Sequence, residues 1–333
     1  SQATGENSTA IGRDAQAINN KNTPAIGVSS RATAENSTAT GANSRATAEN
    51  STATGQNAQA KSTNSTALGQ NAQATQDNAT ATGQNAQATA VNTTTIGVSS
   101  KATDIEATAT GFEADASGAY TTALGSRTIA SGFGSTANGA QSEALADRTT
   151  ASGYDSLASA INSTATGANS RATQDNAVGN NAIADGIDAL SVGAANQSLA
   201  NRTISIGSNN SVEAEGSSAI GQSNVINSSD TFVLGSNINN SGLFDGFGNI
   251  VPIGNTVTNS VYLGSNTVAT AGNQVGTQVL QSNGQQGNTT TAGNTGSVAS
   301  TVIGSINYNN FAASTANGVI SVGSANSERR VQN

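Results

Sequence analysis

The side chains best suited to catalysis or metal binding are rare in this sequence. It contains no His and no Cys, which excludes His or Cys catalysis, Ser-His-Asp triads and the usual zinc sites. Carboxylates can act in pairs as general acid and base, but here they are scattered, with no repeating position that brings two of them together regularly. Examples are Glu35, Glu49, Asp77, Asp104, Glu113 and Asp115. We therefore expect no enzymatic activity, no cofactor and no bound metal.

Glycine is abundant, but its spacing does not match the known ligand-binding glycine motifs. No Lys-Ser/Thr pair follows the glycines, as a phosphate-binding loop requires. Calcium-binding glycine repeats need an Asp at a fixed place in each repeat, and none recurs. The net charge of −8 and the pI near 4.4 argue against nucleic acid or an anionic membrane as a partner, because both require a basic face.

The composition also bounds the class of protein. Aromatic residues make up 3% and charged residues 10% of the 333 residues, with 37 Gly and no Trp or Met. This is too few large side chains for ordinary globular cores. No apolar run approaches the roughly 18 residues of a membrane span, and we expect no signal peptide within these residues. Because the chain starts at Ser1 and lacks Met, we expect it to be part of a longer protein.

A strict repeat organises most of the chain. Glycines recur every 14 residues, and after one 12-residue step from Gly167 to Gly179 the period resumes as far as Gly235. Three places before the glycine, Thr recurs ten times without a break from Thr38 to Thr164. A small residue, usually Ala, follows this Thr, and a second Ala lies five places after the glycine. Such self-similarity indicates a solenoid.

The repeat unit predicts two short strands and two turns. In Asn64-Ser65-Thr66-Ala67-Leu68-Gly69, strand alternation puts Thr66 and Leu68 on one face and Ala67 on the other. A second short strand follows the glycine, as in Gln59-Ala60. Gly and Asn supply the turn conformations that other residues resist. Each unit is therefore predicted to form one coil of a β solenoid, paired in parallel with the next coil.

A core of stacked Ala is very thin, so we expect the Thr/Ile/Leu face to be buried against other chains. The candidates for this oligomer face are Ile26, Leu68, Ile96, Leu124, Ile206 and Ile220. The thin core and the apolar face predict assembly, but the sequence does not give the number of chains.

Two further motifs recur at exposed places. Asn-x-Ser/Thr matches a glycosylation acceptor at Asn36, Asn50, Asn64 and Asn78, although Asn in the turn and Thr in the strand explain the same pattern. Isolated cations could protect sheet edges or contact an acidic ligand. They are Arg31, Arg45, Lys61, Lys101, Arg127 and Arg171.

The units at 64–69 and 217–221 resemble the head repeat of the YadA-like trimeric autotransporter adhesins, which reads roughly Asn-Ser-Val-Ala-Ile-Gly. The run from Gly318 to Asn333 resembles the start of that family's neck. The resemblance divides the chain into head repeats at 1–235, irregular repeats at 236–303 with an insertion at 269–300, a final repeat at 304–323 and the start of the neck at 324–333. The insertion is interpreted either as a loop that braces the coils or as a ligand-contacting lobe.

This resemblance implies a left-handed parallel β-roll, three chains side by side, and contacts between chains at the neck through Glu328, Arg329 and Arg330. It implies an adhesin head on the bacterial surface, projecting from an outer membrane to which an anchor outside this chain attaches it. The expected partners are copies of the chain itself and matrix proteins, solid surfaces or sister cells.

Two other functions stay open. Thr-Ala-Thr recurs at 38–40, 52–54, 80–82, 108–110 and 164–166, and a flat Thr-x-Thr array is typical of ice-binding solenoids. Ile11, Leu68, Ile96 and Leu124 interrupt this array. A solenoid enzyme acting on polysaccharide is the third alternative, and the missing carboxylate and basic clusters argue against it.

Overall fold

The structure is a computed structural model that describes residues 1–18, 21–244, 250–254, 256–267, 279–280, 286–287, 300–303, 306–309, 320–324 and 327–328. The chain divides into two compact units, residues 1–172 and 173–333. Throughout the described residues every regular element is a β-strand and none is a helix. The prediction of an all-β parallel solenoid is confirmed.

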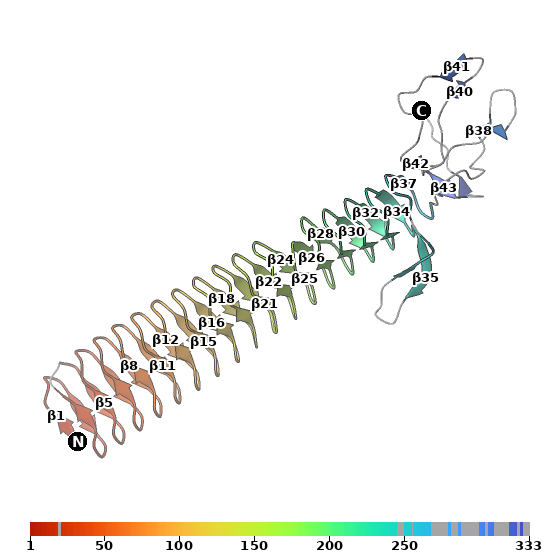
Figure 1. Cartoon of the computed structure of the whole chain (residues 1–333). Coiled ribbons are helices and arrows are strands. Elements are labelled where there is room, and N and C mark those ends of the chain that lie inside the picture. The colour runs from red at the N-terminus through yellow and green to blue at the C-terminus, as the bar shows by residue number, and fades with distance from the viewer. Residues whose placement is uncertain are drawn as a thin grey trace. The chain divides into compact units, whose positions relative to one another are not determined.

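The first unit consists of successive coils, each with one three-residue strand and one two-residue strand (Figure 1). The three-residue strands are β2 (Thr9–Ile11), β4 (Pro24–Ile26), β6 (Thr38–Thr40), β8 (Thr52–Thr54), β10 (Thr66–Leu68), β12 (Thr80–Thr82), β14 (Thr94–Ile96), β16 (Thr108–Thr110), β18 (Thr122–Leu124), β20 (Thr136–Asn138), β22 (Thr150–Ser152) and β24 (Thr164–Thr166). The two-residue strands are β1 (Gln2–Ala3), β3 (Gln16–Ala17), β5 (Arg31–Ala32), β7 (Arg45–Ala46), β9 (Gln59–Ala60), β11 (Gln73–Ala74), β13 (Gln87–Ala88), β15 (Lys101–Ala102), β17 (Asp115–Ala116), β19 (Ile129–Ala130), β21 (Glu143–Ala144), β23 (Leu157–Ala158) and β25 (Arg171–Ala172).

Each strand pairs in parallel with its equivalent one repeat away. Between β8 and β10 the register joins Thr52 to Thr66 and Thr54 to Leu68. Between these strands the Thr52 amide donates to the carbonyl of Ser65 at 2.9 Å. The three-residue strands therefore form one parallel sheet of the unit and the two-residue strands another, with coils about 4.8 Å apart.

Two turns close each coil. The glycine turn follows the long strand, as at 41–43, and the asparagine turn precedes it, as at 34–36. The last residue of each turn has a left-handed backbone, with φ of 58° at Asn43 and 56° at Asn36. Asn tolerates this conformation better than most residues because its short polar side chain bonds locally. The predicted role of Asn in the turns is confirmed.

A buried hydroxyl completes many of the turns. Ser37 Oγ donates to the Ala34 carbonyl at 2.6 Å, and Ser44 Oγ donates to the Gly41 carbonyl at 2.9 Å. Both serines are fully buried, and the two carbonyls also accept from the serine amides, so these bonds satisfy hydroxyls that would otherwise lie unpaired in a dry interior. The Ser or Thr that directly follows many of these turns therefore helps to close the coil, even though it contributes little apolar volume.

Alanine methyl groups fill the interior of the first unit. Ala39 and Ala46, from the two strands of one coil, are both 0% exposed, and the same two positions repeat along the unit. Thr38 and Thr40 on either side of Ala39 are half-buried. The predicted alternation, with Ala inside and Thr or Ile outside, is therefore confirmed.

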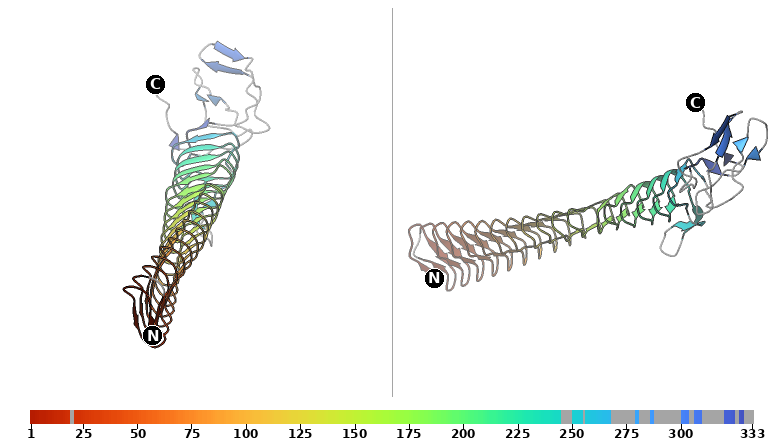
Figure 2. Two further views of the ribbon diagram at one scale, coloured as in Figure 1. Left: turned by 90° about the vertical axis from the view of Figure 1, so that its left-hand side faces the viewer. Right: turned by 45° about the horizontal axis from the view of Figure 1, so that its top comes forward.

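The second unit repeats this plan with larger side chains. Its long strands are β26 (Asn176–Val178), β28 (Leu190–Val192), β30 (Ile204–Ser208), β32 (Ser218–Gln222), β34 (Phe232–Ser236), β37 (Val261–Leu263) and β42 (Ile320–Ser321), and its short strands are β27 (Ile183–Ala184), β29 (Gln197–Ser198), β31 (Ser211–Val212) and β33 (Val225–Ile226). Figure 2 shows these coils from two further directions. Here the core contains Val212, Ile226, Val233 and Tyr262 in place of Ala.

Tyr262 is the largest side chain in this core. Its hydroxyl oxygen accepts a hydrogen bond from the Val257 amide at 2.8 Å. Burial raises the pKa of the Tyr262 phenol above 10.0, and the bond to Val257 opposes this shift. The ring is 2% exposed and therefore replaces several methyl groups of the thinner coils.

Beyond Gly235 the coils continue only after an interruption. The antiparallel strands β35 (Asn240–Phe244) and β36 (Ile250–Pro252) come first, after which β37 pairs with β34. Three further antiparallel pairs are β38 (Val279–Leu280) with β39 (Gln286–Gly287), β40 (Ser300–Ile303) with β41 (Ile306–Asn309), and β43 (Gly323–Ser324) with β44 (Ser327–Glu328). Most of the predicted insertion at 269–300 and of the final repeat at 304–323 lies outside the described residues. The four predicted chain segments stay predictions.

Candidate functional surface

The outer face of the long strands carries the predicted oligomer-face residues. Ile26, Leu68, Ile96 and Leu124 point away from the Ala core and are 37–47% exposed. In the second unit Ile206 and Ile220 are half-buried and adjacent, since the register of β30 and β32 pairs them directly. In the first unit Ile11 pairs in register with Ile26, and beyond them coils that mostly carry Thr separate the apolar side chains of this face.

The same face is far more apolar in the second unit than the sequence interpretation recognised. Large apolar residues replace Thr at most of the outward positions of the long strands from β28 onwards. These residues are Leu190, Val192, Ile204, Ile206, Ile220, Phe232, Leu234, Val261 and Leu263. Leu234, for example, is 48% exposed. The signal was present in the sequence, because the unbroken Thr position ends at Thr164 and Leu190, Ile204 and Phe232 follow at the same place.

The predicted neck residues are only partly described. Glu328 ends β44 and pairs in register with Gly323, while Arg329 and Arg330 lie outside the described residues. Their predicted contacts between chains stay a prediction.

The outer face of the short strands is mostly polar, with Ile129, Leu157 and Ile183 as apolar exceptions. Arg31 and Arg45 are exposed and lie opposite one another in register, and Gln59, Gln73 and Gln87 continue the same position.

Arg127, in a glycine turn, pairs with Glu113 at 2.9 Å. Its guanidinium carbon lies 5.6 Å from the centroid of the Phe112 ring, within the range of a cation–π contact.

Amide ladders run along the turns of the first unit. The Nδ2 atom of Asn50 donates to Oδ1 of Asn64 at 3.2 Å, and Asn64 donates in the same way to Asn78 at 3.1 Å. The amide nitrogen that glycosylation would modify is therefore the donor of the ladder. This arrangement favours the structural interpretation of the Asn-x-Ser/Thr pattern.

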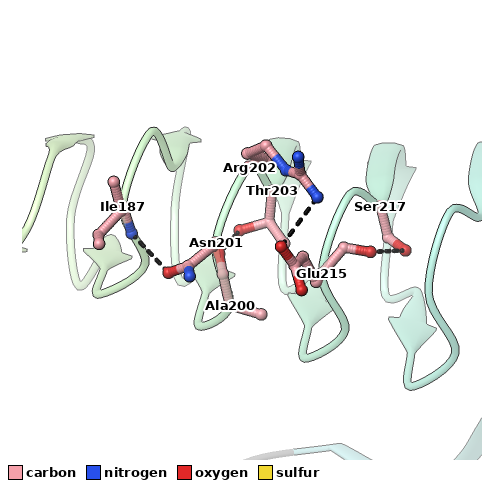
Figure 3. A network of polar contacts seen from close by, with 7 residues as sticks. All are labelled: Ile187, Ala200, Asn201, Arg202, Thr203, Glu215 and Ser217. Atoms are coloured by element: carbon pink, nitrogen blue, oxygen red, sulfur yellow. Dashed lines mark hydrogen bonds and ion pairs between the residues drawn. The ribbon is translucent and has the colours of Figure 1, made fainter.

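Polar side chains also link successive asparagine turns, as Figure 3 shows in the second unit. Asn201 Oδ1 accepts a hydrogen bond from the Ile187 amide at 3.0 Å, and Arg202 pairs with Glu215 at 2.8 Å. In the first unit Asp77 accepts from the Thr63 amide in the same way, at 3.1 Å. Side chains on this edge therefore contact the neighbouring coil directly.

Chemistry-bearing groups do not gather at one place in the part of the chain that the structure describes. In those residues no group of three or more Asp or Glu side chains is placed to hold a metal ion. A search of the same residues found no helix with the length and apolarity needed to cross a bilayer. The features available for function are thus the outer faces and the turn edges of the coils.

These features define a class of protein: a parallel β solenoid that presents long, repetitive outer surfaces. Within this class, the family model described as YadA head domain repeat (2 copies) matches the chain at residues 3–20, 19–44, 32–58, 46–72, 60–86, 88–114, 105–128, 130–156, 158–178 and 198–224. The matches cover more than half of the 333 residues, and the chain belongs to this family of adhesin heads. A comparison with curated proteins gives no match.

Proposed function

We propose that this chain is the head of a homotrimeric adhesin that holds a bacterium to host matrix proteins, solid surfaces or sister cells without catalysing a reaction. Heads of the YadA family belong to cell-surface adhesins of the outer membrane, and these adhesins form homotrimers. The observation that supports the assembly most directly is the apolar outer face of the long strands. A face rich in Leu, Ile and Phe is costly to leave in water.

The energetics favour burial of this face in both units. Ile96 keeps 47% of its surface exposed within one chain, so covering it completely would add about 1 kcal/mol per chain. Three chains would each contribute such residues from successive coils. Because weak contacts in an assembly reinforce one another, the same symmetry would strengthen attachment to a repetitive ligand.

Assembly can be tested with matched substitutions on the two sheets. The purified chain is expected to sediment at three times its mass of 32.6 kDa. Ile96→Glu and Leu68→Glu should each weaken association by about a hundredfold or more, because an unpaired carboxylate buried between chains costs several kcal/mol. Leu157→Glu, on the outer face of the short strands between Glu143 and Arg171, is the control and should leave assembly unchanged. If Leu157→Glu dissociates the protein and Ile96→Glu does not, the long strands do not form the interface.

Attachment is measured on the same samples, with matrix proteins, bare plastic and bacterial cells as targets. The assembled head should bind at least one of them and the dissociated Ile96→Glu variant should bind more weakly. A stable monomer with no attachment to any target would contradict the proposal.

The Thr positions support one alternative that the same samples can test. Thr38 and Thr52 pair in register, as do Thr40 and Thr54, which forms the regular hydroxyl array typical of an ice-binding surface. A monomer that produces thermal hysteresis would favour this function over an adhesin, whereas its absence supports the adhesin.

A further inference from the structure

Two exposed aromatic rings meet on the asparagine-turn edge of the first unit. The chain has only ten aromatic residues, yet Tyr120 and Phe133, from adjacent coils, place their ring centroids 5.4 Å apart at an interplanar angle of 67°. They are 49% and 52% exposed. In such an edge-to-face pair one ring keeps a face free for another contact.

Tyr120 stands at a turn position that Asn occupies in most earlier coils, with the left-handed backbone usual for that position (φ of 59°). Glu106 and Arg148 have the same conformation in the neighbouring turns. The feature particular to this turn is therefore the exposed ring and not the backbone.

Gly134 is an exposed turn residue next to Phe133 and carries no side chain. It is the residue of the next coil that corresponds to Tyr120, and a Cβ atom placed on it would meet no heavy atom within 4 Å outside its two chain neighbours. Its φ of 63° is the usual one for this position. In the earlier coils this position holds the Asn side chains of the amide ladder. We call this site, formed by Tyr120, Phe133 and Gly134, the Gly134 notch.

Polar groups of both signs flank the Gly134 notch. Glu106 corresponds to Tyr120 in the preceding coil, and Arg148 corresponds to Gly134 in the following coil. Asp147 uses Oδ1 to accept a hydrogen bond from the Phe133 amide at 2.9 Å. Arg148 donates from Nε to Asn162 at 2.7 Å. A strongly cationic or anionic ligand would meet a like charge on one side, whereas a neutral ligand rich in hydroxyls could bond to both sides.

We propose that the Gly134 notch binds a pyranose ring of a neutral polysaccharide, with the C–H face of the sugar stacked on an exposed ring of the Tyr120–Phe133 pair. Its hydroxyl groups then bond to Asp147, Arg148 and Glu106. Ile105, at the turn position of Phe133 two coils earlier, is also exposed and extends the apolar surface for a neighbouring sugar. The proposal names a ligand class for the adhesin and rests on that proposed function for its biological role.

The notch is tested by two variants that change it in opposite ways. Phe133→Ala removes one ring, and Gly134→Asn fills the open space with the residue that earlier coils carry there. Because Asn accepts a positive φ, Gly134→Asn should melt like the wild type. The control is Phe112→Ala, which removes another exposed ring (44%, against 52% for Phe133) from a glycine turn.

The probes are cello-oligosaccharides, chito-oligosaccharides and mannan, with heparin as the anionic comparison, and the readouts are calorimetric titration and the fluorescence of the tyrosines. The wild type should bind at least one neutral probe. Phe133→Ala and Gly134→Asn should each weaken binding about tenfold, and Phe112→Ala should not.

Three results would overturn the proposal: no neutral probe binds, both notch variants bind like the wild type, or Phe112→Ala weakens binding equally. Binding to heparin alone would also reject it, because the ligand would then be anionic. The outcome is independent of assembly, since the notch lies within one chain. A trimer that binds no neutral sugar would reject the notch and leave the adhesin intact.

Discussion

The glycine that ends each long strand offers the sharpest test of how the coils are held together. Gly41 has φ of +126°, and a Cβ atom placed on it would lie 2.6 Å from the carbonyl oxygen of Gly55 in the next coil. Ordinary carbon contacts are roughly 3.5 Å, so Gly41→Ala would require the two coils to separate locally by about 0.9 Å. The Gly55 amide also donates to the Thr40 carbonyl at 2.7 Å across the same two coils, and the same movement would strain this bond.

The expected cost follows from these contacts. The left-handed backbone costs an alanine about 1–2 kcal/mol, crowding in a tightly packed site adds about 1–3 kcal/mol, and a weakened hydrogen bond adds about 1 kcal/mol. Gly41→Ala should therefore lower the free energy of unfolding by about 3–6 kcal/mol. Gly134→Ala is the control without crowding: its φ of +63° lies in the left-handed helical region and its Cβ meets nothing within 4 Å outside its two chain neighbours, so its cost should be about 1 kcal/mol.

The assay is thermal and urea unfolding followed by circular dichroism, with amide hydrogen exchange to locate the loosened coils. Exchange should accelerate in the coils next to Gly41 and not in distant ones, because each coil contacts mainly its neighbours. If both variants unfold alike, close contact between coils is not the reason for glycine at this position.

Two further substitutions test the interior of the coils. Tyr262→Phe removes the oxygen that accepts from the Val257 amide and should cost about 1–3 kcal/mol. Because the pKa of Tyr262 is raised in the folded state, the wild type keeps the stabilisation by the neutral phenol below pH 10 and loses it as the pH rises through the folded pKa. Urea unfolding at several pH values should therefore show a smaller loss of unfolding free energy at high pH in Tyr262→Phe than in the wild type. Thr95→Val removes a buried hydroxyl that has no hydrogen-bond partner among the described residues. The substitution should raise the unfolding free energy by about 1 kcal/mol. A lower melting temperature for the variant would show that the Thr95 hydroxyl makes a hydrogen bond in the wild type.

The sequence by itself determined the repeating architecture of this protein. Side chains alternate across a strand with a period of two, so the order Thr66-Ala67-Leu68 was enough to place Ala67 inside and its neighbours outside. The 14-residue spacing predicted which residues stack, and Asn64 marked a turn because few residues accept its backbone conformation.

Only the tertiary structure decided which side chains from different repeat positions meet. Tyr120 and Phe133 are 13 residues apart and occupy different places in their turns, so the repeat does not pair them; they touch because their side chains lean towards each other across adjacent coils. The spacing likewise did not reveal that Gly134 leaves open space. The bond from Val257 to Tyr262 depends on packing inside a widened coil. A period specifies the backbone position of every residue, but contacts between unlike positions depend on side-chain direction and volume, which only the folded chain determines.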